Sequence, residues 1–157
     1  MGLIKFVAMA SEEANAFRNG AFDAYGMKPE RRISDGSGVP CRHCLRSVPA
    51  GKPYLTMAYR PFPETQPYAE TGPIFLCAEV CERAPDSDVM PELFRARTEW
   101  LLRGYGHDDR IVYGTGAVTP KKDICTRAHE LLQRDDVAYL HMRSAQYNCY
   151  QVRIDRV

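Results

Sequence analysis

The sequence predicts an α+β fold in one compact domain over residues 1–157, with a mainly antiparallel or mixed sheet and a few helices. One observation is size, because 157 residues with 45% hydrophobic content suffice for one buried core. A second is a series of short strand-forming runs separated by loops rich in proline and glycine. The third is a stretch of clear helical periodicity in the carboxy-terminal third.

The amino-terminal half contains three expected strands and one expected helix. Residues 3–9 and 54–59 are rich in strand-forming side chains, and residues 72–77 form a short apolar run that begins at a glycine. We expect Ser11 to cap a helix after the first strand, because its hydroxyl can accept a hydrogen bond from the first turn. The helix should end at Asn19-Gly20.

The carboxy-terminal third predicts a β-α-β-β unit. Residues 111–118 read as a strand, Thr119 can cap the next helix, and Pro120 suits its first turn. Strands over residues 137–143 and 148–154 complete the unit. The helix should bury four apolar residues that recur at helical spacing, Ile124, Ala128, Leu131 and Leu132.

The last two strands are expected to form a hairpin with a three-residue loop, residues 145–147. A slip by one residue would turn the apolar set of one strand outward, so the pattern favours one register. In that register Arg143 lies opposite Cys149 and His141 lies opposite Gln151. The shared apolar face then contains Ala138, Leu140, Met142, Tyr150, Val152 and Ile154.

The charge balance argues against nucleic acid or a membrane as a partner. Lys and Arg total 21 and Asp and Glu total 20, so the chain has no general positive field. The apolar run before Ala8-Met9-Ala10 is short and interrupted by Lys5, so we expect no signal peptide. No stretch approaches the roughly 20 apolar residues of a membrane span. We therefore expect a cytoplasmic protein with a small-molecule or protein partner of unknown identity.

Two closely spaced cysteine pairs are the most informative feature of the chain. Cys41 and Cys44 are separated by two residues, and Cys77 and Cys81 by three. Two such pairs can supply the four thiolates of a tetrahedral structural zinc. Two alternatives stay open, namely four buried reduced thiols and a redox-active Cys-Arg-His-Cys motif. His43 is a possible substitute ligand, although we expect it to be exposed.

A second candidate site lies on the polar face of the predicted hairpin. Cys149 would there have Arg143 directly across the ladder and His141 diagonally across it, and a guanidinium beside a thiol favours the thiolate. Arg42 and Tyr68 are expected to complete this pocket. The arginines that could line an anion site, or simply be solvated, are Arg42, Arg46, Arg60, Arg143 and Arg153.

Several segments together resemble the uncharacterised bacterial family known as domain of unknown function 1203. The segments are Pro40-Cys-Arg-His-Cys-Leu45, Tyr59-Arg-Pro-Phe62, Pro67-Tyr-Ala-Glu70, Gly72-Pro-Ile-Phe75, Leu102-Arg-Gly-Tyr105, Ala138-Tyr-Leu-His-Met-Arg143 and Asn148-Cys-Tyr150. The resemblance implies a compact bacterial α+β domain and supplies no activity. It also implies that Cys41, Arg42, Arg143 and Cys149 follow the family pattern.

The sequence therefore indicates two alternative functions. The first is a binding or regulatory domain stabilised by zinc at the four paired cysteines. The second is a small-anion-binding protein or an enzyme that uses Cys149 and Arg143. No catalytic motif in the sequence is complete, so whether the chain is an enzyme stays open.

Overall fold

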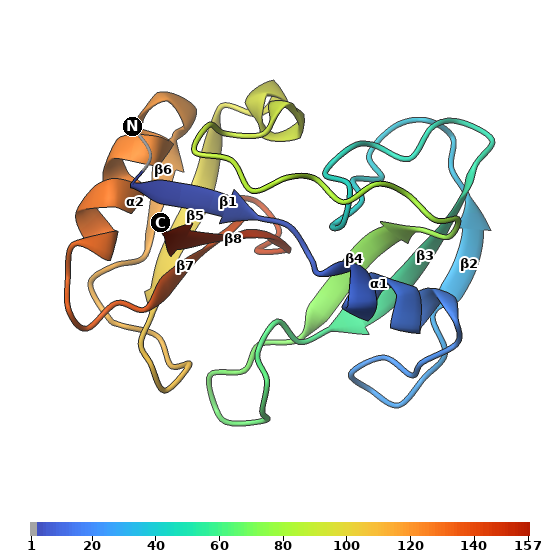
Figure 1. Cartoon of the computed structure of the whole chain (residues 1–157), viewed down its shortest axis with the longest axis horizontal. Helices are drawn as coiled ribbons and strands as arrows, with labels where there is room; N and C mark the ends of the chain where they lie inside the picture. Colours follow the sequence, from blue (N-terminus) through green and yellow to red (C-terminus); the bar gives the residue numbers. More distant parts are fainter. Residues whose placement is uncertain (1–2) are drawn as a thin grey trace. The chain divides into compact units, whose positions relative to one another are not determined.

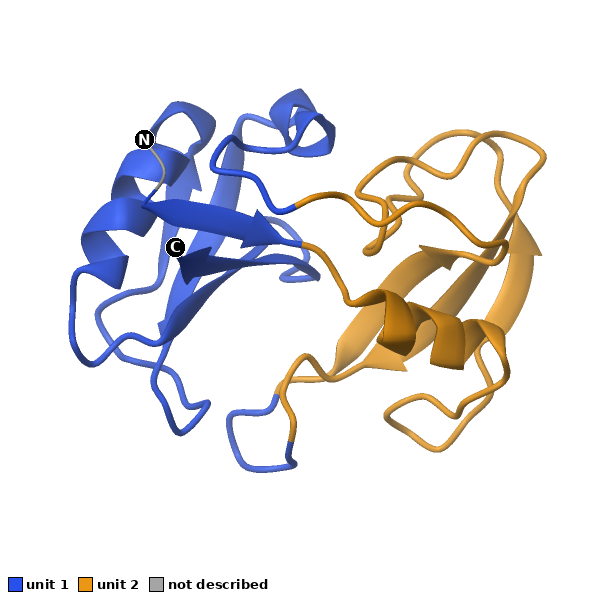
Figure 2. Ribbon diagram, in the orientation of Figure 1, with its two compact units in different colours: residues 1–7, 64–69, 86–157 blue, residues 8–63, 70–85 orange. Residues whose placement is uncertain are grey.

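The computed structural model describes residues 3–157 and has an α+β fold, as predicted. Its eight strands form two antiparallel sheets, accompanied by two α-helices and two short 3₁₀-helices (Figure 1). The chain divides into two compact units, residues 1–7, 64–69 and 86–157 in one and residues 8–63 and 70–85 in the other (Figure 2). The helices of residues 3–157 all fall short of the roughly 20 apolar residues that a membrane-spanning helix requires.

The first unit contains a five-stranded antiparallel sheet in the order β1-β8-β7-β5-β6. Its elements are β1 Ile4–Val7, η1 Glu92–Ala96, β5 Glu99–Tyr105, β6 Ala117–Pro120, η2 Lys121–Asp123, α2 Ile124–Leu132, β7 Tyr139–Ser144 and β8 Tyr150–Arg156. Helix α2 packs against this sheet through the four apolar residues that the periodicity identified (Figure 1). Alternate residues of β5, β7 and β8 supply the rest of this core, because successive side chains of a strand point to opposite faces.

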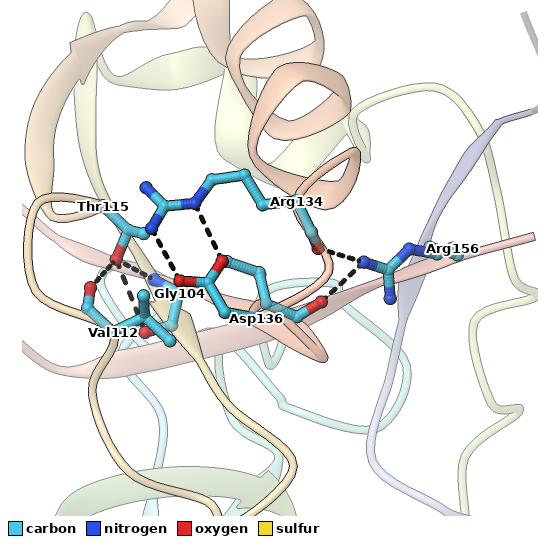
Figure 3. Close-up of polar contacts among 7 residues, drawn as sticks. Gly104, Val112, Thr115, Arg134, Asp136 and Arg156 are labelled. Carbon is cyan, nitrogen blue, oxygen red and sulfur yellow. Dashed lines mark hydrogen bonds and ion pairs between the residues drawn. The ribbon is translucent and has the colours of Figure 1, made fainter.

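The predicted β-α-β-β unit is present, but its first strand is shorter and later than residues 111–118. Gly114 has a φ of 88°, and the hydroxyl of Thr115 donates to the carbonyl of Val112, so this segment turns (Figure 3). The Thr115 oxygen also accepts a hydrogen bond of 2.9 Å from the backbone N–H of Gly104 in β5. Pro120 ends β6 and does not open the helix, because η2 lies between β6 and α2.

Hydrogen bonds from Arg156 connect β8 to the carboxy-terminal end of α2 and the turn that follows it. The guanidinium of Arg156 donates to the backbone carbonyls of Leu132, Arg134 and Val137 at 2.6 to 2.8 Å. Arg134 in turn forms two hydrogen bonds, of 2.9 and 2.8 Å, with the carboxylate of Asp136 (Figure 3). Charged donors at this position satisfy carbonyls that a helix end leaves without an intrahelical partner.

The β7–β8 hairpin has most of the predicted apolar face in a different register, but Tyr150 does not belong to that face, because its ring lies 4.8 Å from that of His141. Leu140 pairs with Ile154 and Met142 pairs with Val152, and all four side chains are buried. The prediction paired Leu140 with Val152, so the pairing of these residues is shifted by two. A two-residue shift keeps each side chain on its original face, because the strand period is two, so the apolar pattern could not exclude it.

The predicted pairs of Arg143 with Cys149 and of His141 with Gln151 are therefore wrong. His141 pairs with Arg153, and a register shift after Met142 places Arg143 opposite Tyr150. The physical reason lies in the loop, which covers residues 145–149 and has Asn148 in the left-handed region at φ 59°. The backbone N–H of Ser144 donates to the carbonyl of Cys149 at 2.9 Å and closes this longer loop.

The second unit contains a three-stranded antiparallel sheet in the order β2-β3-β4 and the helix α1 (Figure 2). The bounds are α1 Ser11–Arg18, β2 Glu30–Ile33, β3 Pro53–Tyr59 and β4 Gly72–Cys77. Strands β3 and β4 lie where the sequence predicted them, whereas β2 was not predicted. All four residues of β2 are exposed, so it lacks the alternation of apolar and polar residues that identifies a strand.

Helix α1 begins and ends close to the predicted positions, but Ser11 is not its cap. Ala10 occupies the N-cap position, and no side chain forms a capping hydrogen bond there. The hydroxyl of Ser11 instead lies 2.8 Å from Nε2 of His43. The predicted helix cap thus became a contact between residues far apart in the sequence.

Candidate metal centre

The first cysteine pair lies in a tight hairpin. The backbone N–H of Cys41 donates to the carbonyl of Arg46 at 2.9 Å, and that of Leu45 donates back to Cys41 at 3.0 Å. Leu45 has a φ of 54°, the left-handed conformation that glycine usually supplies after the second cysteine of a zinc knuckle. A leucine held in this region has an unfavourable backbone conformation, so other interactions must stabilise the turn.

The second pair begins where β4 ends. Cys77 is the last residue of that strand, and Cys81 follows in a segment without regular structure. The first hairpin is joined to β4, because Cys41 and Phe75 form an isolated parallel bridge and Arg42 N–H donates to the Phe75 carbonyl at 3.1 Å. This backbone connection brings the two pairs together.

The four sulfur atoms have the spacing of a tetrahedral metal site. All four Sγ atoms of Cys41, Cys44, Cys77 and Cys81 lie within 4.8 Å of one another. The Sγ atoms of Cys41 and Cys81 are 4.0 Å apart, and those of Cys44 and Cys77 are 3.9 Å apart. A tetrahedron with zinc–sulfur bonds of about 2.3 Å has sulfur–sulfur edges of about 3.8 Å. The four cysteines could therefore hold a metal ion.

The thiol groups interact strongly with one another. Hydrogen bonds with the Cys44 and Cys77 thiols hold the pKa of Cys41 far below its ordinary value. The hydrogen bond with Cys41 raises the pKa of Cys44 to about 12. Hydrogen bonds with Cys41 and then Cys44 raise the pKa of Cys77. Burial, and then the charge of Cys41, raises the pKa of Cys81. The four thiols therefore do not ionise independently, and a bound cation would favour the thiolate form of all four.

Nitrogen donors lie beside two of the four sulfur atoms, those of Cys41 and Cys81. The backbone N–H groups of His43 and Cys77 donate to the Cys41 sulfur at 3.4 and 3.3 Å. Arg18 Nη2 lies 3.0 Å from the Cys81 sulfur. A guanidinium can only donate, so the Cys81 sulfur accepts, and this contact favours its thiolate form. Four thiolates in a tetrahedron suit zinc better than the harder cations, so the residues fit the predicted metal.

His43 connects the sulfur cluster to helix α1. Its side chain is 2% exposed, so the expectation of an exposed histidine is wrong. Nδ1 lies 3.1 Å from the Cys81 sulfur, and Nε2 lies 2.8 Å from the Ser11 hydroxyl. Burial, and then the charge of Arg18, lowers the pKa of His43, which favours the neutral ring. The contacts of Ser11 with His43 and of Arg18 with Cys81 have no local signal in the sequence.

Among the residues of the second candidate site, His141 and Arg143 lie together. His141 is 1% exposed and Arg143 is 4% exposed, and Arg143 Nη2 lies 3.2 Å from His141 Nδ1. Arg143 Nη1 also donates to the Asn148 carbonyl at 3.2 Å. The backbone carbonyl of Cys149 accepts a hydrogen bond from Ser144 N–H, and the Cys149 sulfur lies 3.9 Å from the Tyr147 carbonyl. The cross-strand argument for a Cys149 thiolate beside Arg143 therefore no longer applies.

Arg42 and Tyr68 have their own local contacts. Arg42 Nη1 donates to the Pro40 carbonyl at 2.8 Å, which braces the cysteine hairpin, and its guanidinium lies 6.0 Å from the Phe75 ring. The Tyr68 hydroxyl accepts from that of Tyr113 at 3.3 Å, and the Arg110 guanidinium lies 5.6 Å from the Tyr68 ring. A pocket formed by Arg42, Tyr68, His141, Arg143 and Cys149 stays a prediction.

The comparisons with known proteins identify a family and no activity. The family model described as Protein of unknown function (DUF1203) matches residues 38–156, which include all four clustered cysteines. A search of curated proteins and a search of solved structures both gave no match. The family match covers well over half of the chain and agrees with the resemblance inferred from the sequence. The chain belongs to the DUF1203 family of proteins of unknown function.

Proposed function

We propose that this chain is a bacterial cytoplasmic binding or regulatory domain in which Cys41, Cys44, Cys77 and Cys81 bind a structural zinc ion. The observation that carries the proposal is the convergence of the four sulfur atoms within 4.8 Å. The hydrogen-bond donors directed at Cys41 and Cys81 support it, because they stabilise thiolates. A cytoplasmic location fits, because thiols stay reduced there.

A structural role fits these ligands better than a catalytic one. Four protein thiolates close the coordination shell, whereas a catalytic zinc keeps one position for water or substrate. The ion would join the Cys41–Cys44 hairpin to the end of β4, and it would help stabilise Leu45 in its left-handed conformation. Metal binding would then contribute directly to the free energy of folding.

Metal analysis and one matched pair of variants test the proposal. We expect about one zinc per chain in protein purified under reducing conditions without chelators. Cys44→Ser should lose most of the zinc, and Cys125→Ser on α2 should retain it, since Cys125 is not among the four clustered cysteines. Weakening zinc binding by about a thousandfold would cost about 4 kcal/mol. For a chain of this size that is a fall in Tm of about 8–16 °C.

Cobalt provides a readout that does not depend on a variant. Wild-type protein reconstituted with Co²⁺ should show the absorption of a tetrahedral thiolate site, and added zinc should abolish it. Freshly prepared reduced protein that contains no zinc and takes up no cobalt would contradict the proposal. Equal zinc content in the two cysteine variants would contradict the assignment of Cys44 as a ligand.

We also propose that residues 1–157 form one domain. Neither compact unit is a continuous stretch of sequence, because the chain passes repeatedly between them. Units interleaved in this way are expected to unfold together rather than as separate domains. A single calorimetric transition supports one domain, and two well-separated transitions would contradict it.

A second candidate function is a small-anion-binding protein or an enzyme that uses Cys149 and Arg143. The observation that favours it is the burial of the Arg143 guanidinium next to His141. Alkylation of Cys149, followed by mass spectrometry as a function of pH, tests the role of the thiol. A half-maximal rate near pH ~8.5, as for an ordinary cysteine, would contradict a reactive role for Cys149.

A further inference from the structure

Three side chains in adjacent strands of the five-stranded sheet form a row. Arg103 in β5 pairs with His141 in β7, and His141 pairs with Arg153 in β8. Paired residues project from the same face of a sheet, with Cβ atoms about 5 Å apart. Their neighbours Leu102, Leu140, Met142 and Val152 are buried in the core. The row therefore lies on the face opposite to the one that packs on α2.

Tyrosine side chains hold the two arginines of the row in place. Arg103 Nε donates to the Tyr105 hydroxyl at 2.9 Å, and the Arg153 guanidinium lies 4.0 Å from the centre of the Tyr139 ring. Tyr139 is itself fixed, because its hydroxyl donates to Asp109 at 2.7 Å. The guanidinium groups are thus oriented by contacts of the fold, which lowers the entropic cost of binding a ligand.

His141 is a neutral hydrogen-bond donor in this row. Arg143 Nη2 lies 3.2 Å from His141 Nδ1, and a guanidinium only donates, so Nδ1 accepts and the ring hydrogen is on Nε2. Burial, followed by the charges of Arg143, Arg153 and Arg103, keeps the pKa of His141 well below its ordinary value. Arg103, His141 and Arg153 therefore each carry N–H donors.

The charge distribution on this face points to a ligand of negative charge. Arg103 and Arg153 pair with His141 across the sheet, and Arg143 Nη2 lies 3.2 Å from its ring, so three guanidinium groups gather around this histidine. One carboxylate, that of Asp155, accepts from Arg153 at 2.6 Å. Planar guanidinium groups bind carboxylate and phosphate oxygens through parallel N–H donors. The side chain of Arg153 is 43% exposed and Arg103 is half-buried, so both arginines have surface open to solvent.

We propose that Arg103, His141 and Arg153 form a binding site for a small oxyanion, the phosphate or carboxylate group of a ligand. The site goes beyond the structural zinc, since none of its residues belongs to the sulfur cluster. It also does not require Cys149, so it can be present whether or not that thiol is reactive. Arg143 positions His141 through its contact with Nδ1.

Calorimetric titration with inorganic phosphate and, separately, with acetate tests the proposal on the full-length protein. Saturable binding of either ion at concentrations up to about 10 mM supports the site and identifies the preferred oxyanion. Arg103→Gln and Arg153→Gln should each weaken binding about tenfold or more, the usual effect of losing a charged hydrogen bond. The control is Arg127→Gln on α2, which removes the same charge from an exposed pair with Glu130 and should change affinity less than about twofold.

Nuclear magnetic resonance of the wild-type protein keeps the test valid if the variants fold poorly. The ring nitrogens of His141 should report an Nε2–H tautomer, and their resonances should shift in a saturable manner during the titration. Absence of saturable binding of both ions, or equal affinity in the Arg153→Gln and Arg127→Gln proteins, would overturn the proposal. A His141 ring that is indifferent to an ion that binds would overturn it as well.

Discussion

The contacts of His43 allow a test of how the protein stabilises its sulfur cluster. The ring lies between two partners, with Nδ1 3.1 Å from the Cys81 sulfur and Nε2 2.8 Å from the Ser11 hydroxyl. In a thiolate centre Nδ1 must carry the hydrogen, and Nε2 then accepts from Ser11. Two amide substitutions separate these contacts. The side-chain nitrogen of asparagine falls near the place of Nδ1, and that of glutamine near the place of Nε2.

The expected magnitudes follow from the two hydrogen bonds. The bond to the Cys81 thiolate has a charged acceptor and should contribute about 1.5–3 kcal/mol, whereas the neutral bond to Ser11 should contribute about 1 kcal/mol. His43→Gln should therefore raise the zinc Kd roughly 10- to 100-fold, within the usual range for a group that supports a metal ligand. His43→Asn should raise it only about fivefold. Ser11→Ala should match the smaller effect, since it removes the same neutral bond.

Competition with a chromophoric chelator measures the zinc Kd of each variant. Both amides replace a ring that is 2% exposed. The destabilisation caused by altering a buried side chain therefore largely cancels when the two variants are compared. The absorption of cobalt-loaded protein adds a readout that global destabilisation does not move, and only His43→Gln should shift its sulfur-to-metal band. Equal Kd values for the asparagine and glutamine variants would refute a specific role of the Nδ1 contact.

Two further predictions concern parts of the fold away from the cluster. Thr115→Val should lower the free energy of unfolding by about 1–3 kcal/mol in denaturant titrations, because it leaves the buried N–H of Gly104 without its side-chain acceptor; Thr115→Ser, which keeps the hydroxyl, should be less destabilised, and the opposite order would contradict this reasoning. Asp23→Ala should lower the Tm at pH 7 by about 2–4 °C, since the carboxylate accepts from the backbone N–H groups of Tyr25, Met27 and Ala58. Although burial acts to raise the pKa of Asp23, these three hydrogen bonds lower it overall, so its stabilising effect is present above the unfolded pKa of 3.8 and is lost as the pH falls through the folded value. The difference in Tm between wild type and Asp23→Ala should therefore shrink below pH ~4, and a constant difference would contradict this assignment.

Local patterns identified the elements whose signals are periodic. The helix α2 was predicted with its four buried residues because a helix that covers a sheet repeats apolar residues every three or four positions. Strand β4 was predicted at its observed bounds because its apolar run begins after a loop. Strand β2 was missed for the converse reason, since Glu30–Ile33 is exposed on both faces and owes its conformation to pairing with β3.

The hairpin shows where local patterns lose information. Alternation determines which face of β7 and β8 is buried, and that prediction is correct for Leu140 and Val152. Alternation does not distinguish registers that differ by two, so the partners of Arg143 and His141 could not be obtained from it. The loop around Asn148 decided the register, and it thereby placed Arg153 rather than Gln151 beside His141.

The sequence by itself determined the α+β class, the family resemblance and the identity of the four clustered cysteines. Short spacing within each pair is a local property, so it can be recognised without the fold. Only the tertiary structure decided that the two pairs meet, that Ser11 and Arg18 reach the cluster through His43 and Cys81, and that Arg103 joins His141 and Arg153 in one row. The residues in these contacts lie far apart along the chain. The separation is 12 positions for His141 and Arg153 and 63 positions for Arg18 and Cys81. Backbone pairing across strands determines such contacts, and a residue's near neighbours in sequence carry no record of its distant partners.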